Sequence, residues 1–472
     1  MSSKLVFGPT RTLAICCIIG LVGWFLPTPA GLTDNGWHLL VVFITTILAV
    51  ILKPLPMSAV TLISLAILLL TKTITFQEGF MGFSHPVIWL LLFALFIAQT
   101  FVQTGLGRRI GYWFIRAFGK KTLGLGYGLL LTDALIAPAV PSVTARSAGI
   151  VLPIMQGVAG SYDSHPHAPS SKKIGTYLNV LIFQTTVITS AMFMTAMAAN
   201  PLLAELVAGI GLELSWGKWA LGAVVPGVLS LALLPILLMK ICPPELKETP
   251  EAPALATKAL SDMGPMSFKE KVLSSVVLLL LSLWVFGTMI GVSAATAGLI
   301  GLCLLLATRV IEWDTVLSKH SIWETFIWFA ILLSVATALN KAGVMVWLGD
   351  QIITAFHGLD WRISFPLLAL VYFYTHYLFA SSTAHVTAMF LPFLSAAIAL
   401  GTPSYLAMFI LLYFSNLFGG ITHYSLAPAP ALHAAGYVDL KEWWRVGFIT
   451  SVFNIIIWST VGLGWWKVLG YW

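Results

Sequence analysis

Two short polar motifs hold the residue types best suited to chemistry, and both interrupt apolar sequence. The first reads Ser-Val-Thr-Ala-Arg (residues 142–146) and the second reads Ser-Ser-Thr-Ala-His (residues 381–385). Arg146 and His385 are 239 positions apart (385 − 146 = 239), and Thr144 and Thr383 have the same separation (383 − 144 = 239). An arginine at membrane depth is costly and marks a candidate functional site. The repeated motif therefore indicates a two-part site built by an internal repeat.

The position of each motif at a helix start predicts anion binding. We expect Thr144 and Thr383 to cap the helices that follow them. A helix N-terminus offers unpaired N–H groups and partial positive charge. Arg146 in the first turn opposes the helix dipole, and a bound anion would remove this conflict. Two such helix ends facing each other would bind the two ends of a dianion, with His385 donating a hydrogen bond or carrying charge.

The composition places these motifs inside a membrane protein. The chain has 472 residues, of which 58% are hydrophobic and 9% charged, whereas soluble domains carry about 25% charged residues. The alternation typical of a transmembrane β-barrel is absent. The net charge of +7 comes from cations between apolar runs, which suits membrane topology better than nucleic-acid binding. The four cysteines show no metal-ligand or disulfide spacing.

Apolar runs predict an all-α polytopic membrane protein with about 11 transmembrane helices and two re-entrant helical hairpins. The arms of the first hairpin, 123–137 and 145–159, have 15 residues each, so each reaches roughly 22 Å against an apolar bilayer core of about 30 Å. The second hairpin has arms at 365–380 and 384–399. The expected spans are 12–27, 37–52, 57–70, 86–104, 174–199, 219–239, 271–290, 294–307, 323–339, 406–425 and 446–468, with surface helices at 105–121 and 347–356.

The order of these segments predicts two inverted repeats. Residues 1–36 hold a first span, 37–240 form repeat one with hairpin 122–159, 241–270 form a cytoplasmic linker, and 271–472 form repeat two with hairpin 363–400. An odd number of spans in each repeat turns the second upside down. The segment 105–121 carries five cations, whereas its counterpart 341–362 carries two cations and two aspartates. The positive-inside rule then places the mouth of the first hairpin in the cytoplasm, and inverted repeats with broken helices are typical of transporters.

Structural roles for the same residues remain open. Asp133 is a possible partner for Arg146, which would make the arginine part of a structural ion pair. Serine and proline in membrane helices also serve as packing and kink residues, and a lone buried histidine is often structural. Asn200-Pro201 and Ala427-Pro428 are expected to interrupt two spans and to line the same cavity.

These motifs resemble those of the divalent anion/sodium symporter family, and in particular its exchanger branch, the citrate/succinate, tartrate/succinate and 2-oxoglutarate/malate antiporters. The resemblance covers nearly the whole chain. It implies scaffold and transport domains, an elevator mechanism and a homodimer. The family has Ser-Asn-Thr at each hairpin tip, but Val143 and Ser382 replace the asparagine here, which argues against carboxamide contacts and sodium binding. The resemblance also implies that Arg146 and His385 supply positive charge in place of sodium.

We therefore expect a sodium-independent exchanger of small carboxylates such as malate, succinate, 2-oxoglutarate or citrate. The physical argument is that an empty carrier would have to move an unpaired Arg146 through a low-dielectric barrier. A sodium-coupled dicarboxylate symporter is the alternative, and a passive anion channel is a further one. Known catalytic motifs such as HExxH are absent, so an enzyme is not expected. We expect no cofactor or metal, and a location in a cell membrane, most simply a bacterial inner or plasma membrane. The candidate substrate-binding residues are Ser142, Val143, Thr144, Arg146, Asn200, Pro201, Ser381, Ser382, Thr383, His385 and Pro428.

Overall fold

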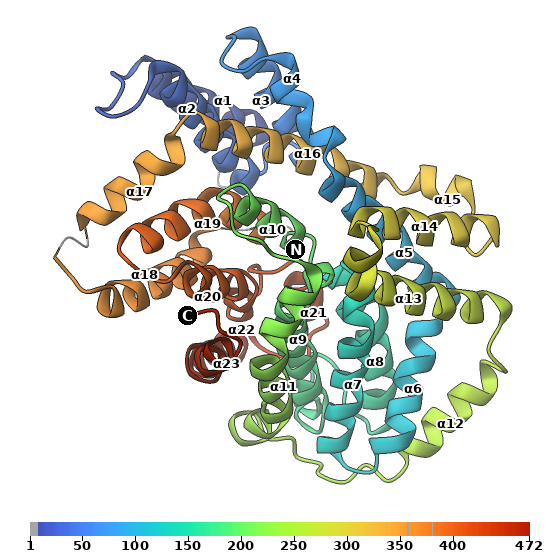
Figure 1. The fold of residues 1–472 in the computed structure, drawn as a ribbon. Coiled ribbons are helices and arrows are strands. Elements are labelled where there is room, and N and C mark those ends of the chain that lie inside the picture. Colours follow the sequence, from blue (N-terminus) through green and yellow to red (C-terminus); the bar gives the residue numbers. More distant parts are fainter. Residues whose placement is uncertain (1–7, 356–357, 380) are drawn as a thin grey trace. The chain divides into compact units, whose positions relative to one another are not determined.

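The chain folds into helices joined by short turns, as the computed structural model shows (Figure 1). It describes residues 8–355, 358–379 and 381–472. The described residues contain no strand, only an isolated bridge between Lys121 and Glu248. The all-α prediction is confirmed. Parts of the predicted N-terminal segment (1–7), surface helix (356) and second hairpin (380) lie outside the described residues.

Many helices are long and apolar enough to cross a bilayer. Among the described residues, seven helical stretches meet both conditions, and four further apolar helices are shorter. The seven are Asp34–Leu52, Pro86–Thr104, Thr122–Ala139, Trp216–Ile241, His320–Lys341, Ser382–Ala399 and Leu440–Val468, and the shorter four are Thr10–Phe25, Met57–Leu70, Ala294–Ala307 and Ser404–Gly420. Together they agree with a polytopic membrane protein, and both hairpins contribute a stretch of 18 residues.

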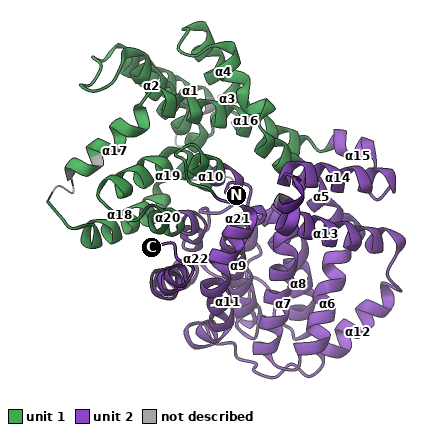
Figure 2. Cartoon of the chain, in the orientation of Figure 1, with its two compact units in different colours: residues 1–92, 205–213, 319–411 green, residues 93–204, 214–318, 412–472 purple. Residues whose placement is uncertain are grey.

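The helices form two compact units, each assembled from segments far apart in the sequence (Figure 2). Unit 1 comprises residues 1–92, 205–213 and 319–411, and unit 2 comprises 93–204, 214–318 and 412–472. Each unit therefore draws on both expected repeats. The first hairpin belongs to unit 2 and the second to unit 1.

Unit 1 contains the first helices and the second hairpin. Its helices include α1 (Pro9–Phe25), α2 (Asp34–Leu52), α3 (Met57–Leu70), α4 (Phe76–Phe80), η1 (Met81–Ser84), α16 (His320–Lys341), α17 (Val344–Ala355), α18 (Trp361–Thr375), η7 (His376–Leu378) and α19 (Ser382–Ala399). Helix α16 packs against α3, α4 and η1. That contact is very close, because a Cβ added to Gly82 would meet the carbonyl of Ala330.

Unit 2 contains the first hairpin and the final helices. Three helices each contain a sequence boundary between the two units, so that one end belongs to unit 1 and the other to unit 2. They are α5 (Pro86–Thr104), α10 (Asn200–Ala208) and α20 (Ser404–Leu417). The others are α6 (Leu106–Phe118), α7 (Thr122–Ile136), η2 (Ala137–Ala139), η3 (Ala145–Val151), α8 (Leu152–Ser161), η4 (Pro169–Lys172), α9 (Gly175–Met192), η5 (Met194–Ala196), α11 (Trp216–Ile241), α12 (Ala252–Asp262), α13 (Phe268–Phe286), η6 (Gly287–Ile290), α14 (Ala294–Ala307), α15 (Trp313–Ser318), η8 (Phe418–Gly420), α21 (Ala429–Ala434), α22 (Leu440–Ile457), η9 (Trp458–Gly462) and α23 (Leu463–Val468).

Local sequence explains many helix starts. Thr33, Ser215 and Ser293 each accept a hydrogen bond from the backbone N–H three residues later. Ser267 and Glu270 cap each other's backbone groups at the start of α13. Such caps satisfy N–H groups that lack helical partners.

The predicted linker is more ordered than its composition indicated. Residues 241–270 contain α12, which packs against α6. Arg109 on α6 is buried, donates to both carboxylate oxygens of Glu270, and donates to the carbonyl of Gly264 at 2.8 Å. The helix predicted at 105–121 therefore forms, but one of its cations is buried in an ion pair.

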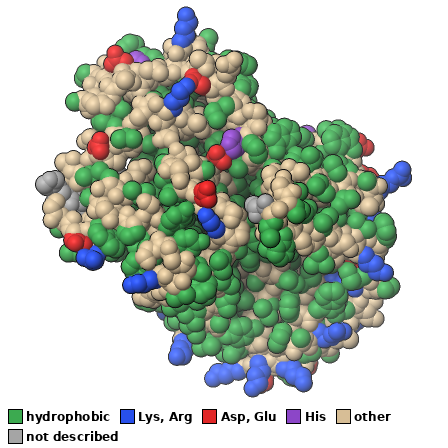
Figure 3. Space-filling model, in the orientation of Figure 1, with side chains coloured by type: hydrophobic (Ala, Val, Ile, Leu, Met, Phe, Trp, Pro, Cys, Tyr) green, Lys and Arg blue, Asp and Glu red, His purple; other side chains and the backbone are tan. Residues whose placement is uncertain are grey.

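The surface of unit 2 separates apolar and charged regions. Hydrophobic side chains cover much of its visible face, whereas Lys and Arg side chains gather along its lower edge (Figure 3).

Candidate substrate-binding site at the hairpin tips

The first tip is capped by a serine. Ser142 Oγ accepts a hydrogen bond from the N–H of Ala145 at 3.2 Å, and the helix begins at Val143. Thr144 is exposed and already helical, with no side-chain cap. The prediction that Thr144 caps this helix is therefore wrong. The helix then runs as a π-helix over η3 before α8 begins.

The second tip repeats this arrangement. Ser381 Oγ accepts from the N–H of Ala384 at 3.4 Å, and α19 begins at Ser382. Thr383 thus lies inside the helix, so its predicted capping role is also wrong. Because 381 − 142 = 239, the two capping serines are equivalent positions of the repeat. The serine that begins both motifs is the signal that could have assigned the caps.

Arg146 is fully buried, and each of its three guanidinium nitrogens donates hydrogen bonds to oxygen atoms of unit 2. Nε donates to Asp133 Oδ1 at 3.2 Å. Nη1 donates to the backbone carbonyls of Val140 at 2.6 Å and Ala196 at 2.5 Å. Nη2 donates to the hydroxyls of Thr189 and Ser190 at 3.4 and 3.2 Å. The guanidinium is therefore enclosed by five oxygen atoms from the hairpin and from the broken helix beside it.

Asp133 completes this cluster from the first arm of the hairpin. Its side chain accepts hydrogen bonds from Thr186 at 3.2 Å and from Thr189 at 2.5 Å, both on α9. The structural ion pair with Arg146 is therefore present. The premise of an unpaired Arg146 in the empty carrier is wrong, because the hairpin supplies its own counter-charge.

His385 is also fully buried, within unit 1. Its ring lies 4.8 Å from Tyr372, 5.4 Å from His376 and 4.9 Å from Phe379, measured between centroids. Its Nε2 lies 3.2 Å from the hydroxyl of Thr375. The histidine thus packs against the first arm of its own hairpin, as Arg146 does.

Asn200 and Pro201 begin α10 where the fifth predicted span is broken. That span was expected over 174–199, but α9 ends at Met192 and irregular backbone follows. Asn200 donates to the carbonyls of Ser190 and Phe193 across this break, at 2.8 and 3.1 Å. It also accepts a hydrogen bond from Asn416 of α20 at 2.9 Å. Asn416 was not predicted, although an amide inside an apolar run is a recognisable signal.

The predicted residues fall into two groups. Unit 2 holds Ser142, Val143, Thr144, Arg146, Asn200, Pro201 and Pro428, and unit 1 holds Ser381, Ser382, Thr383 and His385. Pro428 is buried at the start of α21, and α21 contacts η3 of the first hairpin. The first hairpin, the broken α9 and the segment after α20 therefore meet within one unit. No cluster of metal-binding side chains occurs in the part of the chain that the structure describes.

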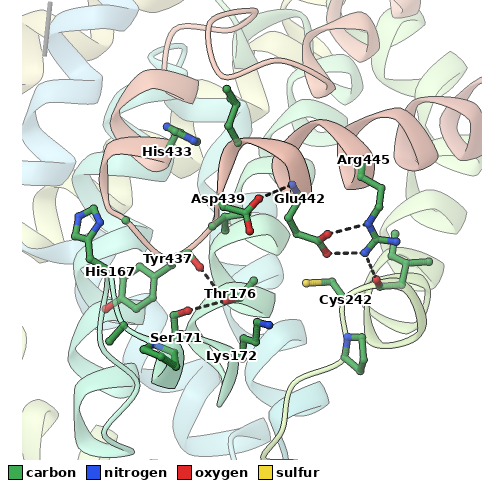
Figure 4. Close-up of a pocket in the computed structure, with 17 residues that line it drawn as sticks. His167, Ser171, Lys172, Thr176, Cys242, His433, Tyr437, Asp439, Glu442 and Arg445 are labelled. Atoms are coloured by element: carbon green, nitrogen blue, oxygen red, sulfur yellow. Dashed lines mark hydrogen bonds and ion pairs between the residues drawn. The ribbon is translucent and has the colours of Figure 1, made fainter.

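A separate cavity of about 700 Å³ lies elsewhere in unit 2 (Figure 4). Glu442 and Arg445 form an ion pair on one side of it, and Arg445 also donates to the carbonyl of Ile241. Cys242 lies beside them, and burial together with the Glu442 carboxylate raises the pKa of its thiol to about 12. The cavity lining contains none of the predicted site residues.

Apolar helices of membrane length, together with buried polar clusters at helix breaks, define an integral membrane protein of the transporter class. The model of the sodium:sulfate symporter transmembrane region matches residues 9–472. The chain therefore belongs to that family, the divalent anion/sodium symporters. It is a transporter and not an enzyme.

Curated relatives and a solved structure agree with this assignment. The chain is 46% identical over 465 residues to "Dicarboxylate transporter 1, chloroplastic" of Spinacia oleracea, covering 98% of this chain and 82% of that protein. It is 44% identical over 461 residues to "Putative malate transporter YflS" of Bacillus subtilis, covering 98% and 96%. The YdaH transporter of Alcanivorax borkumensis has a similar fold, with a TM-score of 0.54 at 13% identity over 97% of this chain and 96% of that one.

Proposed function

We propose that this protein exchanges small di- and tricarboxylates, of the malate, succinate, 2-oxoglutarate or citrate type, without sodium. The substrate class is supported by relatives named for dicarboxylate and malate transport, at 46% and 44% identity. The proposal includes an elevator mechanism, a homodimer and a bacterial plasma membrane, the last because one of these relatives comes from a bacterium.

The observation that carries sodium independence is the position of the Arg146 guanidinium. Its Nη1 donates to Val140 and Ala196, whose carbonyls belong to irregular backbone at the hairpin tip and at the break after α9. In sodium-coupled transporters, carbonyls of unwound helices coordinate the ion. Here a covalently attached cation already binds both carbonyls, which supports a guanidinium in place of a coupling sodium ion at this position.

A carboxylate of the substrate would bind at the helix start of the first hairpin. Ser142 ends the irregular backbone of the first tip, and the exposed Thr144 offers a hydroxyl in the first helical turn. Ser381 and Thr383 provide the same groups at the second tip. Helix N-termini stabilise anions through free N–H groups and the helix dipole.

Exchange follows from the lack of a coupling ion. Since Asp133 pairs with Arg146, the charge of Arg146 alone does not prevent the carrier from returning across the membrane without substrate. A carrier that binds no driving cation still needs a gradient to accumulate a dianion, and a counter-substrate leaving the other way provides it. Exchange of one dianion for another is electroneutral.

Transport into proteoliposomes tests this proposal. Vesicles loaded with unlabelled dicarboxylate should take up labelled dicarboxylate without sodium, at a rate that internal dicarboxylate stimulates. Uptake that requires a sodium gradient and ignores internal substrate would instead identify a sodium-coupled symporter. Uptake that neither saturates nor responds to internal substrate would indicate a channel. Light scattering should give twice the chain mass of 51.2 kDa for the purified protein.

A further inference from the structure

We propose that Asp133 is a positioning residue that neutralises Arg146 and thereby sets how readily the carrier returns without substrate. This inference rests on the proposed exchange function and concerns the same site. Asp133 lies on α7, and only 2% of its surface is exposed. Its carboxylate binds Arg146 of η3 and two threonines of α9, so it joins three segments of unit 2.

The carboxylate is the charged partner in this cluster. The other groups that accept hydrogen bonds from the guanidinium are two backbone carbonyls and two hydroxyls, which are neutral. Removing one partner of a buried ion pair costs several kcal/mol, because the other charge stays buried and uncompensated. Asp133 therefore determines the net charge of the first hairpin in the absence of substrate.

The second hairpin has no acidic residue at the position equivalent to Asp133. Tyr372 occupies the position equivalent to Asp133 (372 − 133 = 239), just as His385 is equivalent to Arg146. Tyr372 and His385 are in ring contact at 4.8 Å. In the first hairpin a carboxylate faces a permanently charged guanidinium. In the second hairpin a phenol ring faces an imidazole at the equivalent positions. This difference between equivalent positions supports charge compensation as the role of Asp133.

The net charge of the site around Arg146 affects the movement of the empty carrier and the movement of the loaded carrier in opposite directions. In the wild type the empty site holds a neutral ion pair, and the loaded site adds the full charge of the dianion. Without the carboxylate, the empty site would carry one uncompensated positive charge, whereas the loaded site would lose part of its net negative charge. Loss of Asp133 should therefore slow the empty return and favour the loaded movement.

The test compares two uptake rates in the purified full-length protein. The first is labelled succinate uptake into vesicles that contain succinate, and the second is uptake into vesicles without it. For Asp133→Asn, we expect the ratio of the first rate to the second to rise about tenfold, since a buried unpaired charge opposes the empty return. Thr186→Val removes one hydrogen bond to the carboxylate without changing charge, so its ratio should equal the wild-type ratio.

Two outcomes would overturn the inference. If both rates fall together for Asp133→Asn, the aspartate only braces the hairpin. Asp133→Glu keeps the negative charge but displaces it, so exchange should slow while the ratio of the two uptake rates stays constant. A raised ratio for this variant would contradict charge compensation. This second variant keeps the test valid even if Asp133→Asn does not fold. Failure of the proposed function is a different result, because the wild type would then show no stimulation by internal dicarboxylate.

Discussion

Arg146 and Asp133 form a buried ion pair across the two arms of one hairpin, with Nε and Oδ1 3.2 Å apart. The pair spans 13 residues of sequence, and His385 and Tyr372 are separated by the same 13 residues (385 − 372) in the other hairpin. Each hairpin is therefore braced at the same place, once by an ion pair and once by a contact between two tilted rings.

Replacing Arg146 with alanine should abolish transport, because five oxygen atoms, one of them from a carboxylate, lose the hydrogen bonds that the guanidinium donates. Guanidinium ions added to both sides of the vesicle membrane should restore part of the activity by filling the vacated space. Labelled dicarboxylate uptake measures both effects. Thr144→Ala serves as the control, since guanidinium should not stimulate it. Normal exchange by Arg146→Ala would show that the site has been misplaced.

Ser142→Ala should lower the free energy of unfolding by about 1 kcal/mol, the usual effect of losing a side-chain cap. Ser381→Ala should have a similar effect, since its hydroxyl caps α19. Thermal unfolding of the purified variants in detergent gives the comparison. Thr144→Ala is the matched control, because Thr144 does not cap the helix. A larger loss for Thr144 than for Ser142 would contradict the observed caps.

Glu270→Ala should loosen both α13 and the turn after α12 from α6, because the buried guanidinium of Arg109 loses the carboxylate on α13. The same guanidinium binds the carbonyls of Met263 and Gly264 in that turn. Breaking such a pair costs about 3–5 kcal/mol. Limited trypsin digestion should then cleave faster at Lys258, within α12. Glu251→Ala is a control, since Glu251 lies just before the same helix and outside this ion pair. Unchanged cleavage in Glu270→Ala would mean that other contacts hold the segment.

The pair of Glu78 and Lys341 should make stability depend on pH in acid. The hydrogen bond from Lys341, followed by those from Thr75, lowers the pKa of Glu78 to about 2 from 4.5. Since the folded pKa is depressed, the contribution is complete above pH 4.5 and is lost as the pH falls towards 2. The Lys341 side chain is 74% exposed, so solvent screening limits the effect to about 1 kcal/mol or less.

Thermal unfolding of Glu78→Gln at two pH values tests this dependence. The variant should be less stable than the wild type at pH 7, and the difference should shrink at the acid end. A difference that stays constant down to the lowest pH at which the protein remains folded would contradict the assigned pKa.

Sequence patterns predicted the helices well where apolar runs end at clear boundaries. The expected ranges 57–70, 86–104 and 294–307 coincide with α3, α5 and α14. Breaks inside apolar sequence were harder to place. The helix α9 ends at Met192 among residues as apolar as those before it, so hydrophobicity gave no sign of the break.

The repeated polar residues of the two hairpin tips were predictable from the sequence, but their contacts were not. The repeated motif identified Arg146 and His385, whereas their partners depend on how each hairpin folds back. A separation of 13 residues matches no helical face, so Asp133 could be named only as one possible partner of Arg146. The caps were misassigned because serine and threonine are both good capping residues, and only the backbone shows where each helix begins.

The close contact between α22 and η8 has a mechanical consequence. A Cβ added to Gly447 would lie 2.6 Å from both the carbonyl oxygen of Gly420 and the Cα of Ile421. Backbones that approach this closely cannot slide past each other without first separating. A displacement of α22 relative to η8 during transport would therefore require these two segments of unit 2 to move apart first.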